Sequence, residues 1–119
     1  MALATVIRKL SGSIAGEPIQ VSATVTDTVI HTGATGSNII DQVFMYAVNS
    51  ATAAVTLRIQ VAGSANIITE EIPPTSDMVP IAGDLRLFGS TGTASVIQMG
   101  ASTSAVIKIF GHVNRITES

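Results

Sequence analysis

The segment IIDQVFMYAVNSATAAVTLRIQV, residues 39–61, carries the clearest structural pattern in the chain. Its second half alternates between apolar and polar side chains, which is the period-two signature of a half-buried β-strand. The apolar side of that half consists of Val55, Leu57, Ile59 and Val61. The first half, Ile39–Val48, is apolar on both faces apart from Asp41 and Gln42, which predicts a central strand. The polar break Asn49-Ser50-Ala51-Thr52 between the halves predicts a hairpin in the middle of a sheet.

The composition also favours a β protein. Val, Ile and Thr dominate, and these β-branched residues fit a pleated sheet better than a helix. The 119 residues suffice for one domain with a hydrophobic core. Charged residues make up only 12% of the chain, whereas hydrophobic residues make up 46%. We therefore expect another chain to cover part of the apolar surface. The alternative is a monomer whose surface is coated with Ser and Thr.

The charges and the missing cysteines exclude several classes of function. The formal charge is −2, and no basic cluster of the kind that binds nucleic acid is visible. The six basic residues are Arg8, Lys9, Arg58, Arg86, Lys108 and Arg115. The absence of cysteine excludes disulfides, cysteine nucleophiles and thiolate metal sites. No apolar run approaches the ~20 residues of a membrane span, and the N-terminus lacks the order of a signal peptide. We therefore expect no nucleic-acid or membrane partner.

The N-terminal residues are separated from the rest by small and turn-forming residues. Residues 1–16 form a first unit, in which Ala4–Leu10 is a candidate strand and Ser11–Gly16 a small-residue linker. We expect an extended arm over residues 1–16 and a single β-sandwich domain over residues 17–119. Such an arm can add a strand to a neighbouring subunit. The alternative is an ordinary edge strand of its own sheet.

The remaining segments alternate in the same way and are bounded by turn residues. Strands are predicted at Pro18–Thr32 with a bulge or break near Asp27, at Ala65–Ile72, around Leu85–Leu87, at Ala94–Met99 and at Ala105–Ile116. Turns are predicted at Gly33–Asn38, Gly63-Ser64, Gly83-Asp84, Gly89–Thr93 and Gly100–Ser104, and a short helical turn is possible around Pro74–Asp77. In the last strand Ile107, Ile109 and Val113 face inward, and Lys108, His112 and Asn114 face outward. Seven to eight strands without helical periodicity predict an antiparallel β-sandwich or jelly roll.

No catalytic or metal-binding motif stands out. His31 and His112 are the only histidines, and nothing in their spacing brings them together with a carboxylate. The adjacent Glu70-Glu71 point to opposite faces of a strand, so they cannot act as one acid–base pair. A calcium site at Asp77 and Asp84 is less favoured than two turns. We therefore predict a protein without enzymatic activity, metal or cofactor.

Two glycine-rich segments and the few aromatic residues give no further site. The segments at 33–37 and 89–93 do not continue into a phosphate loop. The four aromatic residues are Phe44, Tyr46, Phe88 and Phe110, which gives little support for a sugar-binding platform. Phe110 lies on the outward side of the last strand, where it suits a subunit contact or packs under a loop.

Several of these segments resemble small virion proteins of tailed bacteriophages. The matching features are a Tyr-x-x-Asn strand end at Tyr46 and Asn49, followed by an alternating strand, and the turn Ile72-Pro73-Pro74. A closing Gly-x-Val-x-x-Ile strand is formed by Gly111, Val113 and Ile116. The resemblance covers roughly residues 20–117 and consists of strands and turns, not of a catalytic signature. The first 17 residues take no part in it.

The resemblance implies a structural part of a phage particle. Within that class we expect a capsid decoration (cement) protein, which binds the outside of the head and bridges subunits of the major capsid protein. A homotrimer is a natural hypothesis, because capsids offer threefold sites. Synthesis would take place in the bacterial host cytoplasm, and the final location would be the exterior of the virion. The alternatives are a tail or head-fibre component, or a carbohydrate- or metal-binding β-sandwich.

The predicted partner-binding surface is the N-terminal arm together with the exposed aromatic residue of the last strand. Its residues are Thr5, Val6, Ile7, Arg8, Lys9, Leu10 and Phe110. We expect Arg8 and Lys9 to meet acidic groups of the partner.

Overall fold

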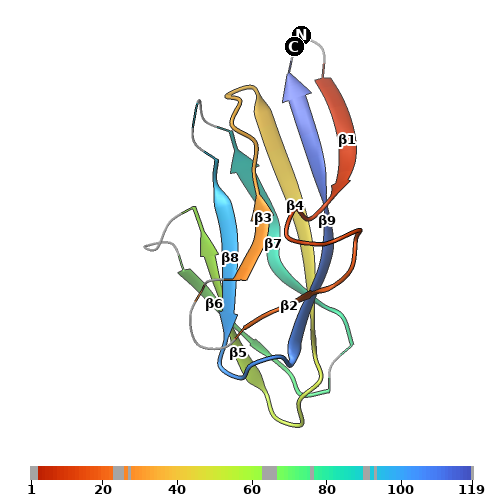
Figure 1. Ribbon diagram of the computed structural model, residues 1–119, viewed down its shortest axis with the longest axis vertical. Coiled ribbons are helices and arrows are strands. Elements are labelled where there is room, and N and C mark those ends of the chain that lie inside the picture. The colour runs from red at the N-terminus through yellow and green to blue at the C-terminus, as the bar shows by residue number, and fades with distance from the viewer. Residues whose placement is uncertain are drawn as a thin grey trace.

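The computed structural model is an antiparallel β-sandwich and describes residues 3–22, 26, 28–62, 67–75, 77–89, 92 and 94–118. Two sheets face each other, and no helix occurs in these residues (Figure 1). The strands are β1 (Leu3–Lys9), β2 (Ile19–Gln20), β3 (Thr28–Thr32), β4 (Ile39–Asn49), β5 (Val55–Val61), β6 (Ile67–Ile72), β7 (Val79–Phe88), β8 (Val96–Ala101) and β9 (Ile107–Glu118). The prediction of an all-β antiparallel sandwich is confirmed.

The strand order is that of a jelly roll. One sheet has the order β1-β9-β4-β7, with the short β2 also paired to β9, and the other has the order β3-β8-β5-β6. Without β2, the first of the eight remaining strands pairs with the last. Successive strands alternate between the sheets except for β5 and β6, which pair with each other in one sheet, and this is the arrangement of two interleaved Greek keys. The predicted number of seven to eight strands is too low, because the described residues form nine.

The additional strand arises where one long strand was predicted. The segment Pro18–Thr32 contains β2, which pairs with β9, and β3, which pairs with β8 in the opposite sheet. The chain therefore crosses between the sheets within this segment, and Val21 is fully buried at the start of the crossing. The predicted break at Asp27 lies outside the described residues. So do residues 63–66, most of the predicted loop at 89–93, and Ser76 of the possible helical turn.

The hairpin predicted between β4 and β5 is wrong. These strands belong to different sheets, so residues 50–54 form an arch between the sheets. In an arch the apolar faces of the two strands meet across the core, whereas in a hairpin they lie side by side. Both arrangements require the same alternation, which is why the pattern could not separate them. Asn49 fixes the arch, since its side-chain amide donates to the carbonyls of Ala53 and Ile72 and its oxygen accepts from Ala51 N–H.

The turn predicted at Gly83-Asp84 is also wrong, because β7 continues through these positions. Pairing with β4 runs from Val43 opposite Leu85 to Met45 opposite Ile81, so β7 contains extra residues that bulge out of the ladder. Ala82, within that bulge, has a positive φ of 60°. A bulge of this kind absorbs turn-forming residues without ending the strand.

The core lies between the two sheets and follows the predicted alternation. Val55, Leu57 and Ile59 are fully buried, and so are Ile107, Ile109 and Val113 of β9, as predicted. Lys108 and His112 are exposed on the opposite face of β9. The central position predicted for β4 is confirmed, since it lies between β9 and β7. The core continues under Leu10, the residue that follows β1.

Candidate functional site

The predicted partner-binding residues divide into an exposed strand and two partly or fully covered side chains. All seven residues of β1 are exposed, and Ile7 and Leu3 show 74% and 64% of their surfaces. Leu10 is only 2% exposed and belongs to the core, so it is not available to a partner. Phe110 is half-buried on β9. β1 pairs with β9 of its own chain along all seven residues. The N-terminal segment is therefore an edge strand of its own sheet, which was the alternative to an arm that pairs with a neighbouring subunit.

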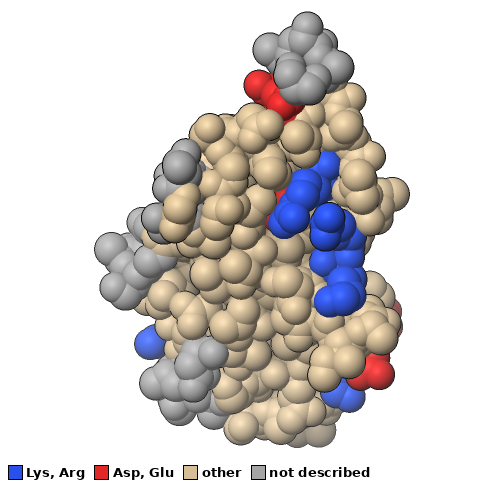
Figure 2. Space-filling model, turned by 45° about the horizontal axis from the view of Figure 1, so that its top comes forward, with Lys and Arg blue, Asp and Glu red and all other residues tan. Residues whose placement is uncertain are grey.

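The pairing of β1 with β9 brings distant basic residues together. Arg8 lies opposite Val113, and Val6 lies opposite Arg115, so these side chains share the inner face of the sheet. Arg8, Lys9 and Arg115 line one side of a groove of about 660 Å³. Figure 2 shows Lys and Arg side chains gathered in one band on this face of the molecule. Half of the basic residues of the chain therefore meet in one place, although they are far apart in sequence.

The opposite wall of the groove comes from the segment that follows β3. It consists of Thr32, Gly33, Ala34, Thr35 and Gly36, with Ile39 at the start of β4. Gly33 N–H donates to Ser95 O, and Ile39 N–H donates to Gly36 O, which fixes both ends of this segment. The groove is therefore bounded by β1 on one side and by a hydrogen-bonded loop on the other.

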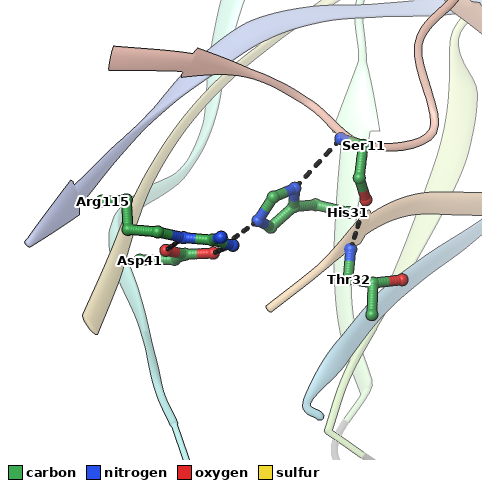
Figure 3. Close-up of polar contacts among 5 residues, drawn as sticks. All are labelled: Ser11, His31, Thr32, Asp41 and Arg115. Carbon is green, nitrogen blue, oxygen red and sulfur yellow. Dashed lines mark hydrogen bonds and ion pairs between the residues drawn. The ribbon is translucent and has the colours of Figure 1, made fainter. Parts of the chain in front are cut away.

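A hydrogen-bonded chain of polar groups lies beside the groove, with the buried His31 and Asp41 at its centre (Figure 3). Arg115 donates to Asp41 through Nε and Nη2, with both N–O distances at 2.8 Å. The same carboxylate lies 2.7 Å from His31 Nε2, and its side chain is fully buried. Ser11 N–H donates to His31 Nδ1 at 3.1 Å, while Ser11 Oγ accepts from Thr32 N–H at 2.6 Å. These hydrogen bonds link the turn after β1 with β3, β4 and β9, which are far apart in the sequence.

These contacts assign the protonation state of His31. Nδ1 accepts from Ser11 N–H, so it carries no proton, and Nε2–H donates to Asp41. The imidazole is neutral and buried, with both ring nitrogens engaged. The three residues Ser11, His31 and Asp41 do not form a catalytic triad, because Ser11 reaches the ring through its backbone amide and its hydroxyl is held by Thr32.

The network stabilises the charged form of its central carboxyl group. Burial by itself raises the pKa of Asp41, but the hydrogen bonds from Arg115 and His31 and the positive charge of Arg115 outweigh it, so the pKa lies below 3.8. The hydrogen bonds to Asp41 raise the pKa of the Arg115 guanidinium against the opposing effect of its burial. Asp41 and Arg115 therefore remain a charged pair at neutral pH.

The second histidine takes no part in this network. His112 stacks on Phe44 with ring centroids 5.0 Å apart, on the outer face of the sheet. Within the described residues, no group of three or more His, Asp or Glu side chains could hold a metal ion. That part of the chain also holds no helix that could span a bilayer.

The position of Asp41 in the sequence is a signal for this site. Asp41 has the same parity as Val43, Met45 and Ala47, so it had to point toward the core and required a buried partner. Arg115 has the same parity as Val113 and lies directly opposite Asp41. Which cation would serve as the partner depends on the β4–β9 register, which the sequence does not reveal.

Comparisons of the chain with protein families, with curated proteins and with solved structures find no match.

Proposed function

We propose that this protein is a structural component of a tailed-phage virion, a decoration protein that binds the outside of the head and bridges neighbouring capsid subunits. The observation that carries the proposal is the exposed apolar outer surface of β1, where Leu3 and Ile7 face away from the core. Large apolar side chains on an edge strand are unfavourable in water and invite pairing with another chain. The proposed class of partner comes from the resemblance of the strand and turn pattern to phage virion proteins.

The jelly-roll architecture supports this role. Closely packed β-sandwiches of this kind recur in viral capsid domains, although they also occur in lectins, so the fold alone does not determine function. The partner of this chain would be the major capsid protein. Self-association as a homotrimer would let several weak contacts act together at a threefold position of the shell.

Copy number in the parent virion tests the placement. Quantitative mass spectrometry of purified particles would compare this chain with the major capsid protein. Hundreds of copies in a fixed ratio are expected for a decoration protein. A few to a few dozen copies would move the protein to the tail or fibres, and its absence from particles would reject a virion role.

Binding of recombinant protein to particles that lack it tests the surface. Ile7→Ser should weaken co-sedimentation with particles, because it removes the most exposed apolar side chain of β1. The matched control is Ile67→Ser, which alters an Ile that is 46% exposed on β6 of the other sheet. Equal losses from both substitutions would contradict a contact at β1. Substitution is preferable to deletion of residues 1–10, because Leu10 belongs to the core.

A further inference from the structure

We propose that the groove beside β1 binds a carboxylate of an extended, acidic segment of a partner protein, and that this segment pairs with the free edge of β1. The inference rests on the proposed function for the identity of that partner, but its chemistry follows from the groove alone. It assigns Arg8 as the direct ligand of the carboxylate, with Arg115 and Lys9 beside it.

The groove is basic. Three cationic residues line it, and the one carboxylate in the network beside them is Asp41. The Arg8 side chain has no hydrogen bond or ion pair within the described residues, and the Lys9 side chain donates only to the carbonyl of Ser13. The groove is therefore locally basic in a chain whose formal charge is −2. Such a surface attracts an anion.

Arg115 is held in place before any ligand binds. Its guanidinium is fixed by two bonds to Asp41, and Asp41 is fixed in turn by His31. A guanidinium has five N–H groups, so three remain after these two bonds. The Arg115 side chain is 22% exposed and lines the groove, so solvent or a ligand can reach the remaining edge. Because the side chain is already ordered, binding an anion there costs little conformational entropy.

The open edge of β1 favours a protein segment as the carrier of the carboxylate. Within the described residues β1 pairs with a strand on one side only, so its other edge is open to an extended chain. Val6 lies on the inner face next to Arg8 and is 53% exposed. Among the described residues that line the groove there is no Phe, Tyr or Trp, and both nitrogens of the buried His31 ring are already engaged, so the groove lacks the stacking surface typical of sites for sugars or single-stranded nucleic acid.

The geometry of β1 also defines the sequence of the segment. Residues directly opposite each other in an antiparallel pair share a face, and opposite charges there are favourable. The segment should therefore place Asp or Glu opposite Arg8 and, two residues later, an apolar residue opposite Val6. A segment that runs antiparallel to β1 and has the sequence Glu-x-Val from its N-terminal side satisfies both positions.

The test is a titration of isotope-labelled full-length protein with the capped peptide acetyl-Thr-Glu-Thr-Val-Thr-amide, followed by NMR. We expect chemical-shift changes at β1, residues 33–36 and the Arg8 and Arg115 side chains. Replacing Glu with Gln in the peptide should weaken binding at least about tenfold, because a charge-assisted hydrogen bond contributes about 1.5–3 kcal/mol. Arg8→Gln should weaken binding similarly, whereas the matched control Arg58→Gln, an exposed arginine on β5, should not.

Several outcomes would overturn the inference. These are equal binding of the Glu and Gln peptides, equal effects of Arg8→Gln and Arg58→Gln, or tighter binding of inorganic phosphate than of the peptide. Thermal unfolding of Arg8→Gln checks that the variant is folded, which we expect because Arg8 is exposed.

Particle binding separates this inference from the proposed function. If Arg8→Gln binds the peptide weakly and also fails to bind particles, both proposals are supported. If the variant binds particles as well as the unaltered protein, the groove inference fails while the virion role stands. If the unaltered protein binds the peptide but no particle, the virion role fails while the groove stands.

Discussion

The two ends of the sandwich are built from the same strands but have opposite chemistry. We call the half away from the groove the closed half. There the inner faces of β4 and β9 carry fully buried apolar side chains, namely Val43, Ala47, Ile107 and Ile109. At the other end, which borders the groove and is called the open end, the inward positions are occupied by Asp41 on β4 and Arg115 on β9. The alternation of the strands does not change along their length, but the residue type does. The change from apolar to charged inward residues therefore marks the boundary between the hydrophobic core and the candidate site.

The difference also separates two sources of stability. The closed half depends on apolar burial, which is roughly proportional to the area removed from water. The open end depends on a carboxylate whose hydrogen-bond donors come from β3 and β9. Its contribution depends on pH and on the matching of donors with acceptors, whereas that of the core does not.

The largest expected effect is in the closed half. Leu57 is fully buried in the core, and Leu57→Ala should lower the free energy of unfolding by about 2–5 kcal/mol through the cavity it leaves. Urea denaturation measures the loss. Thr56→Ala, at the exposed neighbouring position, is the control and should change stability by no more than about 0.5 kcal/mol. A Leu57→Ala loss below about 1 kcal/mol would show that this half is not the tightly packed one.

A smaller loss is expected at the open end from Asp41→Asn. In the more favourable orientation the amide oxygen takes the place of Oδ2 and still accepts from Arg115 Nη2 and His31 Nε2, but the NH₂ group then faces Arg115 Nε–H. One donor remains unsatisfied, so we expect a loss of about 1–3 kcal/mol. Chemical denaturation and the NMR signals of the His31 ring report the change. Unaltered stability would indicate that the network is not formed in solution.

Acid should act on the open end through Asp41. Its pKa in the folded state is lowered from 3.8, so the unfolded state binds the proton more readily. The resulting stability is present above the unfolded pKa and is lost as the pH falls through the folded pKa, below 3.8. Denaturation curves from neutral pH into this range should show a decline that is reduced in Asp41→Asn. Identical pH profiles would assign the decline to other carboxylates.

The smallest effect on stability is expected on the outer face of β1. Ile7→Ser alters a side chain that is 74% exposed, so the free energy of unfolding should change by about 0.5 kcal/mol or less. The thermal midpoint measures this. A larger loss would mean that Ile7 contributes to packing within the chain, and it would weaken the case that its surface serves a partner.

The fold was largely predictable because alternation is a local property. The inward residues of β5 and β9 were identified correctly from parity, and Arg86 lies outward on β7 as expected. The pairing of strands was less predictable. Alternation is the same for a hairpin and for an arch, so the β4–β5 connection was misassigned, and a bulge in β7 was mistaken for a turn.

The candidate site was predictable only in part. Arg8 and Lys9 were selected from the sequence, and the structure places them at the groove. Arg115 was missed, because it reaches them only through the pairing of β1 with β9. Nothing in the spacing of the histidines indicated a carboxylate partner, but His31 is hydrogen-bonded to Asp41 and Ser11. These contacts depend on register and on sheet packing, neither of which can be read from one strand.

The pairing of β1 with β9 has a consequence for folding during synthesis. Leu3 pairs with Glu118, and β9 is also the strand that connects β1 to β4. Every other strand of the described residues precedes β9 in the sequence and leaves the ribosome before it, so one sheet lacks the strand between β1 and β4 until β9 has been synthesised. Such long-range pairing slows folding, since the chain must close its largest loop to form these contacts. Until then the apolar side chains of β1 are an aggregation hazard in the nascent chain.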